Sequence, residues 1–253
     1  MNLLVDIGNT LVKCAVTERG RIVAERRCER LTEAWLDALL AEFPADRAIV
    51  SSTRGAMAGA VELVRSRIGE TLHFTQQTPV PIGNAYRSPE TLGLDRLAAA
   101  VGVATCYPGR NVLVVDCGTA LTIDLVTADG VFRGGCISPG VRMRLEALHA
   151  GTATLPLCEP AELPADSADS GGTDTLLGGT TEEAIVRGVM QSVAFEIEGY
   201  AARFRRDFAD LCIIFTGGDA HFFEKRIKNT IFADHNPVFC GLERILEYHV
   251  REK

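Results

Sequence analysis

The chain has 253 residues, with 26 Lys or Arg against 33 Asp or Glu and a formal charge of −7 at pH 7. The length allows one large domain or two ordinary ones, and an acidic chain without a basic block is poorly suited to binding a nucleic-acid backbone. No stretch of the sequence is long and apolar enough to cross a bilayer. The eight cysteines form no C-x-x-C pair, and the first segment predicts a strand instead of a signal peptide. Both features favour a reduced, cytoplasmic protein.

The first half of the sequence predicts an alternation of strands and helices. Apolar runs predict strands over residues 2–7, 11–17, 21–27, 48–50 and 72–74, and helical spacing predicts helices over 32–43 and 56–69. After a loop over 79–89, a short polar motif at 93–96 leads into an Ala-rich helix over 97–106. Pro108-Gly109 then indicates a domain boundary near residue 110.

The second half begins in the same order. It predicts strands over 111–116, 120–127 and 131–135, an irregular glycine-rich stretch over 134–140 and a helix over 140–150. A long loop over 156–180 precedes a helix over 182–206, which Thr180 or Thr181 caps. A strand over 211–215, another near 238–239 and a helix over 242–250 complete the chain. This order is typical of a layered α/β protein.

One pattern occurs twice in the sequence. Leu3-Leu4-Val5-Asp6-Ile7-Gly8-Asn9-Thr10 returns as Leu113-Val114-Val115-Asp116-Cys117-Gly118-Thr119-Ala120, and matches at the same offset continue as far as Gly20 and Gly130. We therefore expect two duplicated domains, residues 1–110 and 111–253. Each opens with a strand, a carboxylate, a tight turn and a second strand.

The repeated turn suits a phosphate group. The strand delivers Asp to its end, Gly allows close approach of the backbone to a ligand, and Asn or Thr adds polar donors. A divalent metal would offset the charge between carboxylate and phosphate. A single turn of this kind is equally typical of a hairpin, but a hairpin does not require the same carboxylate in both copies.

Two other stretches have both a structural and a functional interpretation. Asp95 stands where a helix is about to begin, so it either stabilises the helix N-terminus or accepts a proton from a substrate hydroxyl during phosphoryl transfer. In the second case Arg96 is a clamp for an anionic group. Thr216-Gly217-Gly218-Asp219 follows a strand and is either a plain turn or a place where a nucleoside approaches the backbone.

In their order and spacing, the motifs resemble those of the type III pantothenate kinases, over essentially the whole chain. The motifs are Asp6-x-Gly8-Asn9-Thr10, Gly93-x-Asp95-Arg96 and Asp116-x-Gly118-Thr119-Ala120, with support from Tyr86, Leu155-Pro156, Thr181-x-Glu183-Ala184-Ile185 and Thr216-Gly217-Gly218. The resemblance implies the fold of the acetate kinase–sugar kinase–Hsp70–actin superfamily, which has two duplicated actin-like (ribonuclease H-like) α/β domains with a nucleotide cleft between them. It also implies transfer of the ATP γ-phosphoryl group to the 4′-hydroxyl of pantothenate, the first step of coenzyme A biosynthesis.

The resemblance further implies a role for individual residues. The ATP phosphates would be held by Asp6, Ile7, Gly8, Asn9, Thr10, Leu11, Val12 and Lys13, with Asp6 directed at Mg²⁺, and Thr119 would contact ATP. Asp95 would be the general base, and the pantothenate site would be lined by Tyr86, Gly93, Leu94, Asp95, Arg96 and Thr181. Asp116 would bind K⁺ or NH₄⁺. The implied assembly is a homodimer formed through the helices over 140–150 and 182–206, with neither nucleic acid nor membrane as a partner.

Two alternatives stay open from the sequence. One is a kinase of the same fold that acts on another small hydroxylated substrate, against which Gly93-x-Asp95-Arg96 and Tyr86 argue. The other is a nucleotide-binding accessory factor in transcription. The complete set of carboxylates and the acidic charge argue against that second role.

Overall fold

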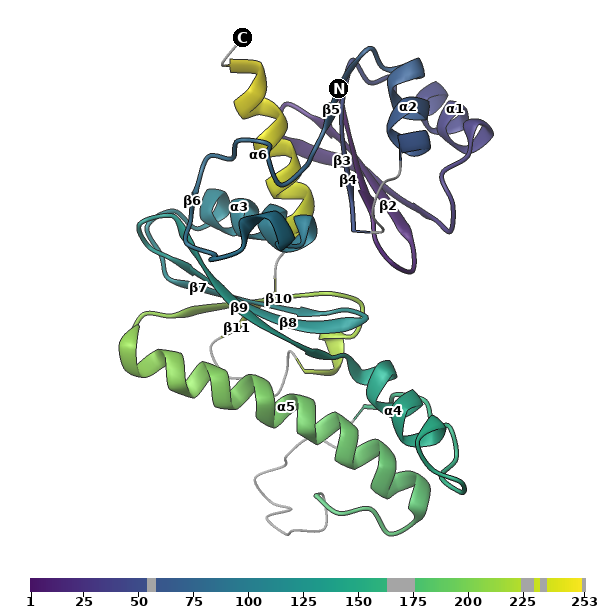
Figure 1. The fold of residues 1–253 in the computed structure, drawn as a ribbon, viewed down its shortest axis with the longest axis vertical. Helices are drawn as coiled ribbons and strands as arrows, with labels where there is room; N and C mark the ends of the chain where they lie inside the picture. Colours follow the sequence, from purple (N-terminus) through teal and green to yellow (C-terminus); the bar gives the residue numbers. More distant parts are fainter. Residues whose placement is uncertain (54–57, 163–175, 224–229, 233–235, 252–253) are drawn as a thin grey trace. The chain divides into compact units, whose positions relative to one another are not determined.

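The computed structural model describes residues 1–53, 58–162, 176–223, 230–232 and 236–251, which form a layered α/β protein with two β-sheets (Figure 1). The strands are β1 (Asn2–Ile7), β2 (Val12–Glu18), β3 (Arg21–Cys28), β4 (Arg47–Ser52), β5 (Glu70–His73), β6 (Gly83–Asn84), β7 (Val112–Cys117), β8 (Ala120–Thr127), β9 (Val131–Pro139), β10 (Cys212–Thr216) and β11 (Thr230–Phe232). The α-helices are α1 (Glu33–Glu42), α2 (Ala58–Arg67), α3 (Leu94–Cys106), α4 (Val141–Ala150), α5 (Thr181–Asp207) and α6 (Pro237–Arg251).

The chain divides into two compact units. Unit 1 comprises Met1–Arg110, Val126–Gly134 and Asp234–Lys253, and unit 2 comprises Asn111–Leu125 and Gly135–Ala233. The division into two domains at residue 110 stays a prediction. Among the described residues, none of the helices has the length and apolar character needed to span a membrane.

The two sheets share one topology. The first has the strand order β3-β2-β1-β4-β5, and the second has the order β11-β10-β7-β8-β9-β6. When β7 to β11 are matched in sequence order with β1 to β5, the two orders are the same, and β6 is an addition at one edge. In both sheets the strand that carries the repeated carboxylate runs parallel to its neighbour, β4 for β1 and β10 for β7. The repeat in the sequence is therefore a repeat of the fold.

The sheet of unit 1 is covered by helices on both faces. One face contributes Leu3 and Val5 to a core that includes Leu36 of α1 and Val64 of α2. The helices α3 and α6 pack against each other, and α6 also contacts β1 and β4. The last helix of the sequence thus completes the unit that the first strand begins.

A buried carboxylate joins α6 to the first two strands. Glu243 is 8% exposed, and it accepts hydrogen bonds from Asn2 Nδ2 at 3.0 Å and from Thr17 Oγ1 at 2.7 Å. Hydrogen bonds to a charged group contribute more than those between neutral groups. This contact therefore fixes α6 on the sheet as well as shielding the carboxylate.

Two glycines allow α3 and α6 to touch along their backbones. A Cβ added at Gly102 would lie 2.0 Å from the Pro237 carbonyl oxygen, and one added at Gly241 would lie 1.8 Å from the Ala98 carbonyl oxygen. Neither position has room for any side chain.

One turn beyond Gly102, the exposed Cys106 is hydrogen-bonded to Cys240, and this bond lowers the pKa of the Cys106 thiol to about 7.

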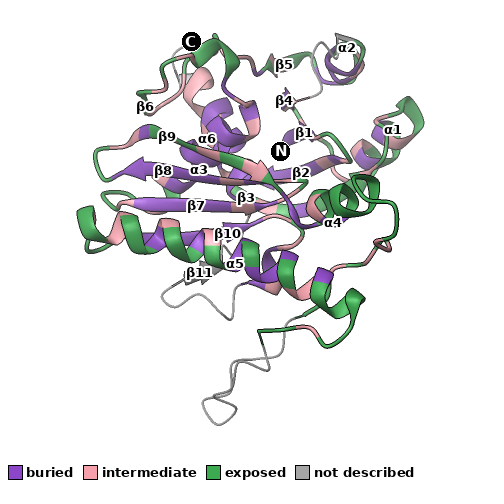
Figure 2. Ribbon diagram, turned by 60° about the horizontal axis from the view of Figure 1, so that its bottom comes forward, coloured by how far each residue is buried: buried purple, intermediate pink, exposed green. Residues whose placement is uncertain are grey.

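The sheet of unit 2 packs against α5 and α4. Leu113, Val115 and Ile213 from the strands share one core with Val193 and Ile197 of α5. Figure 2 shows the resulting division of α5 into a buried face and an exposed face. The Thr180 side chain accepts a hydrogen bond from Glu183 N at 3.2 Å, so the predicted cap is Thr180.

Three predicted boundaries were wrong. The strand β9 continues to Pro139, because Gly135 serves close packing, where a Cβ would lie 2.2 Å from the Ile123 carbonyl oxygen, and does not break the strand. The strand expected near 238–239 is the start of α6: Asn236 Oδ1 accepts a hydrogen bond from Val238 N at 3.0 Å, and Pro237 occupies the first helical position. The helix α3 begins at Leu94, so its first turn contains the polar motif. Of the loop expected over 156–180, residues 163–175 lie outside the described part.

The close contact of α3 and α6 predicts a large cost for Gly102→Ala. We expect it to lower the free energy of unfolding by about 3 kcal/mol, because the new methyl group overlaps the Pro237 carbonyl and the helices must separate. Thermal and urea unfolding measure this loss. Gly59→Ala is the matched control, since a Cβ at this helical position of unit 1 meets nothing within 4 Å. An equal effect of the two substitutions would contradict the prediction.

Candidate functional site

Asp6 ends the central strand of unit 1. It is 5% exposed and lies in register with Ser51 of the parallel strand β4. The Ser51 hydroxyl is buried without a hydrogen-bond partner among the described residues. Beyond the strand, Gly8 N donates to Leu11 O at 3.1 Å and closes a tight turn that leaves Asn9 and Thr10 exposed. The strand end therefore presents a carboxylate, a hydroxyl and a polar turn.

Unit 2 repeats this arrangement. Asp116 of β7 lies in register with Thr216 of β10, again placing a carboxylate beside a hydroxyl at the ends of parallel strands. A main-chain hydrogen bond to the residue after the carboxylate is repeated too. Ile7 O accepts from Thr53 N at 3.0 Å in unit 1, and Cys117 O accepts from Asp219 N at 3.0 Å in unit 2.

Glycines surround the Asp116 carboxylate. A Cβ at Gly217 would lie 2.5 Å from Asp116 Oδ1, and one at Gly118 would lie 3.2 Å from the same oxygen. A Cβ at Gly140 would come within 2.4 Å of the carbonyl oxygens of Gly118 and Thr119. Carboxylate and carbonyl oxygens are the ligands that hard cations prefer, and the glycines keep side chains away from these oxygens, so the residues fit a bound cation.

Protein side chains alone do not complete a metal site in the described part of the chain. No group of three or more His, Cys, Asp or Glu side chains there is placed to hold a metal ion. A cation at Asp6 or Asp116 would draw its other ligands from main-chain oxygens, water or substrate, as Mg²⁺ commonly does at nucleotide sites.

The charges near Asp116 are partly desolvated. Burial raises the pKa of the Asp219 carboxyl, while the nearby Arg142 and His221 act in the opposite direction. Burial, together with Asp116 and Asp219, also raises the pKa of the Cys117 thiol. Cys117 is therefore a neutral thiol at physiological pH and is not a nucleophile.

Asp95 lies in the first turn of α3, where its carboxylate accepts a hydrogen bond from Arg96 N at 2.8 Å. Gly93 precedes it, and a Cβ at Gly93 would lie 2.7 Å from Asp95 Oδ1. Glycine is thus needed for the carboxylate to take this position. The hydrogen bond is the structural role expected of a carboxylate at a helix N-terminus. Asp95 remains half-buried.

Arg96 is held between aromatic rings. It is 7% exposed, and its Cζ lies 5.6 Å from the centre of the Tyr86 ring and 5.8 Å from that of the Phe132 ring. Sequence analysis identified Tyr86 and Arg96 but missed Phe132, which no motif marks. The two rings and the guanidinium all belong to unit 1.

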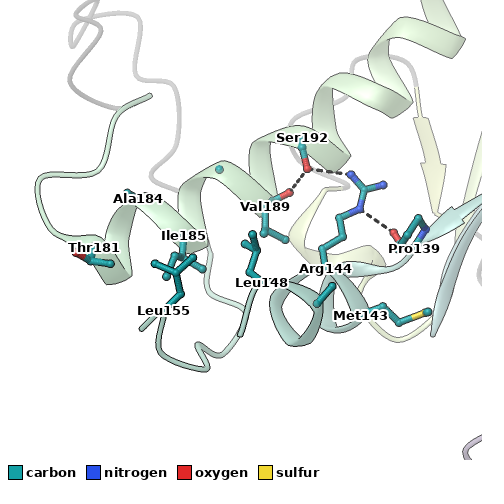
Figure 3. A pocket seen from close by; sticks show the side chains of 12 residues that line it. Pro139, Met143, Arg144, Leu148, Leu155, Thr181, Ala184, Ile185, Val189 and Ser192 are labelled. Atoms are coloured by element: carbon teal, nitrogen blue, oxygen red, sulfur yellow. Dashed lines mark hydrogen bonds between the residues drawn. The ribbon is translucent and has the colours of Figure 1, made fainter. Parts of the chain in front are cut away.

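A cavity of about 840 Å³ lies between α4 and α5 of unit 2 (Figure 3). Its lining is mainly apolar, with Met143 and Leu148 from α4 and Ile185 from α5, and Thr181 stands at the start of α5. Arg144 borders it, donating to Ser192 Oγ at 2.9 Å and pairing with Glu196. Met143 is 42% exposed and the neighbouring Phe195 is 54% exposed.

The predicted site residues fall in both units. Unit 1 holds residues 6–13, Tyr86 and residues 93–96, and unit 2 holds Asp116, Thr119 and Thr181. Within the first group, Ile7 and Val12 belong to the core and Leu94 is buried, so these three have only main-chain atoms to offer a ligand. The roles of all these residues stay predictions.

A sequence profile of the type III pantothenate kinases matches residues 2–203. The chain belongs to this family. A type III pantothenate kinase from Phocaeicola vulgatus is 38% identical over 250 residues, covering 98% of this chain and 99% of the relative.

Solved structures of more distant proteins have the same fold. A protein from Campylobacter jejuni described as a Baf family transcriptional activator superposes with a TM-score of 0.64 at 20% identity, covering 98% of this chain and 99% of that one. An activator of 2-hydroxyisocaproyl-CoA dehydratase from Clostridium difficile, with bound ADPNP, gives a TM-score of 0.53 at 15% identity, covering 100% and 97%. These likenesses show an actin-like fold shared with this kinase family. They do not favour the transcriptional role.

The glycine contacts in this kinase predict that substitution by alanine is destabilising at Gly217 and tolerated at the adjacent Gly218. Gly217 has φ +95° and a Cβ there would strike Asp116 Oδ1, whereas a Cβ at Gly218 meets nothing within 4 Å. We expect Gly217→Ala to cost more than about 2 kcal/mol of stability and to lower kinase activity. Gly218→Ala should change stability by less than about 1 kcal/mol. Thermal unfolding midpoints measure the loss of stability in both variants. Equal midpoints for the two variants would contradict the prediction.

Proposed function

We propose that this kinase transfers the γ-phosphoryl group of ATP to the 4′-hydroxyl of pantothenate, the first step of coenzyme A biosynthesis. The observation that carries the proposal is the Asp95-Arg96 pair at the start of α3, with the carboxylate half-buried and the guanidinium fixed against the Tyr86 and Phe132 rings. Family membership supplies the reaction class, an ATP-dependent phosphoryl transfer. The geometry of unit 1 supports pantothenate as the acceptor, because this substrate carries both a hydroxyl and a carboxylate.

The turn over residues 6–13 is proposed to hold the ATP phosphates. The turn places the exposed side chains of Asn9 and Thr10 beyond the end of the strand, where an amide and a hydroxyl suit phosphate oxygens. Asp6 would hold Mg²⁺, and beside it in the sheet is the Ser51 hydroxyl, which has no hydrogen-bond partner in the described part of the chain. When bound, the metal neutralises charge on the phosphates.

Asp95 is proposed to accept the proton of the pantothenate hydroxyl as that oxygen attacks the γ-phosphorus. The O–H proton passes to a carboxylate oxygen of Asp95, and ADP is the leaving group. Arg96 binds the carboxylate at the other end of the substrate by charge-assisted hydrogen bonds. Holding both ends of pantothenate positions the hydroxyl, and positioning provides most of the rate enhancement in phosphoryl transfer.

Asp116 is proposed to bind a monovalent cation, K⁺ or NH₄⁺, and Thr119 to contact ATP. The support is the contact of Gly118 and Gly217 with this carboxylate, since a side chain at either glycine would crowd the oxygen that the ion would bind. A monovalent ion neutralises one charge and, being larger than Mg²⁺, tolerates a less regular set of oxygen ligands.

We also propose a cytoplasmic homodimer formed through α4 and α5, with Thr181 contributing to the substrate site. The support is the apolar surface that these helices expose: Met143 and Leu148 of α4, which line the cavity, and Phe195 of α5 are all at least 36% exposed. Exposed apolar patches of this kind are typical of protein interfaces. Sedimentation of the wild-type chain and of Phe195→Glu tests the assembly.

Asp95→Asn is the direct test of the proposed base. We expect turnover to fall by more than about a hundredfold, because the amide cannot take the proton, while it keeps the size of the carboxylate and so leaves α3 intact. ADP release with ATP, Mg²⁺ and pantothenate measures turnover, and calorimetry with a nonhydrolysable ATP analogue measures nucleotide affinity. Near wild-type turnover would remove Asp95 from the mechanism.

Asp116→Ala should abolish the response to potassium. In the wild type we expect pantothenate-dependent ADP release to be high in K⁺ and low when Na⁺ replaces it, since the smaller ion fits a K⁺ site poorly. The variant should give the same low rate in both salts. If the variant is still activated by K⁺ as the wild type is, the cation binds elsewhere.

A further inference from the structure

We infer that Phe132 is a positioning residue, which together with Tyr86 orients the Arg96 guanidinium toward the substrate carboxylate. The inference rests on the proposed function, in which Arg96 binds that carboxylate. Phe132 is fully buried and cannot itself reach solvent or substrate. Its effect on the reaction must therefore pass through the groups that it touches.

The two rings form a frame for one cation. Their centres are 6.0 Å apart with an angle of 42° between the ring planes, and Arg96 Cζ lies within 6 Å of both. Guanidinium groups are attracted to the faces of aromatic rings, and the attraction strengthens when the pair is shielded from water. With Arg96 only 7% exposed, this pair is well shielded.

The frame itself is built by the edge strand β6. Asn84 is in register with Phe132, and Ala85 N donates to Phe132 O at 2.9 Å. Asn84 Oδ1 then accepts from Tyr86 N at 2.9 Å, which turns the chain after the strand. Gly134 has φ +100°, and a Cβ there would lie 3.4 Å from the Tyr86 ring. The short pairing of β6 with β9 thus fixes both rings relative to each other.

Such a frame affects substrate binding more than the chemical step. A long flexible Arg side chain loses rotamer freedom when it engages a carboxylate, and a side chain that is already ordered loses less. Removing one ring should therefore weaken pantothenate binding. Among the described residues, the aromatic and cation–π contacts of the Phe132 ring are with Tyr86 and Arg96, so the KM for ATP and kcat should stay close to their wild-type values.

The test is Phe132→Leu, which removes the ring while keeping an apolar side chain. We expect the KM for pantothenate to rise by roughly five- to tenfold, as the loss of a shielded cation–π contact predicts, with kcat and the KM for ATP changed by less than about twofold. Phe74→Leu is the matched control. Phe74 is also fully buried in unit 1 and has no cation–π contact among the described residues. If both variants raise the KM for pantothenate equally, the inference fails.

A double-mutant cycle with Arg96→Met separates this inference from the proposed function. If Arg96→Met leaves the KM for pantothenate unchanged, the carboxylate role of Arg96 is wrong and the inference falls with it. If Arg96→Met raises it, Phe132→Leu should add nothing further in that background. If Phe132→Leu raises the KM for pantothenate in the Arg96→Met background as much as in the wild type, Phe132 has only a general structural role. That result would overturn this inference and leave the proposed function standing. Phe132→Met replaces Phe132→Leu in the cycle if the latter unfolds below the assay temperature.

Discussion

A carboxylate at the end of a central parallel strand, beside a hydroxyl on the next strand, is the arrangement on which both units depend. Asp6 with Ser51 and Asp116 with Thr216 occupy equivalent places. In each unit the residue after the carboxylate accepts one main-chain hydrogen bond from the segment that follows the neighbouring parallel strand. The carboxyl ends of parallel strands gather loops at one edge of a sheet, where ligands usually bind. Duplication gave the chain two such edges, and the family uses the fold for phosphoryl transfer.

The two copies then differ in what their turns contain. In unit 1 the turn after Asp6 exposes Asn9 and Thr10, which suits phosphate oxygens. In unit 2 the turn after Asp116 has glycines at 118 and 217, and a Cβ at either would crowd the Asp116 carboxylate. The same backbone plan can therefore present mainly donors in one copy and mainly acceptors in the other. This difference is the physical basis for proposing phosphate at the first turn and a cation at the second.

Local patterns allowed most of the strands and helices to be predicted along the chain, and the repeat of Asp6 at Asp116 predicted the duplication. The order of the strands within each sheet was not predicted. The start of α6 was missed, although Asn236-Pro237 is a helix-start signal, because the apolar Val238-Phe239 resembles a short strand. Phe132 could not have been found from its neighbours. Its contact with Arg96 depends on the pairing of β6 with β9, which joins segments far apart in the sequence and leaves no periodic pattern in either.

The place of α6 has a consequence for how the chain is made. Protein synthesis proceeds from the N-terminus, and domains generally fold in that order as they emerge. Here Asn2 and Thr17 form their hydrogen bonds with Glu243, and the backbone of α3 packs on Gly241. The first strands made therefore wait, with one face of their sheet uncovered, until the last helix has left the ribosome.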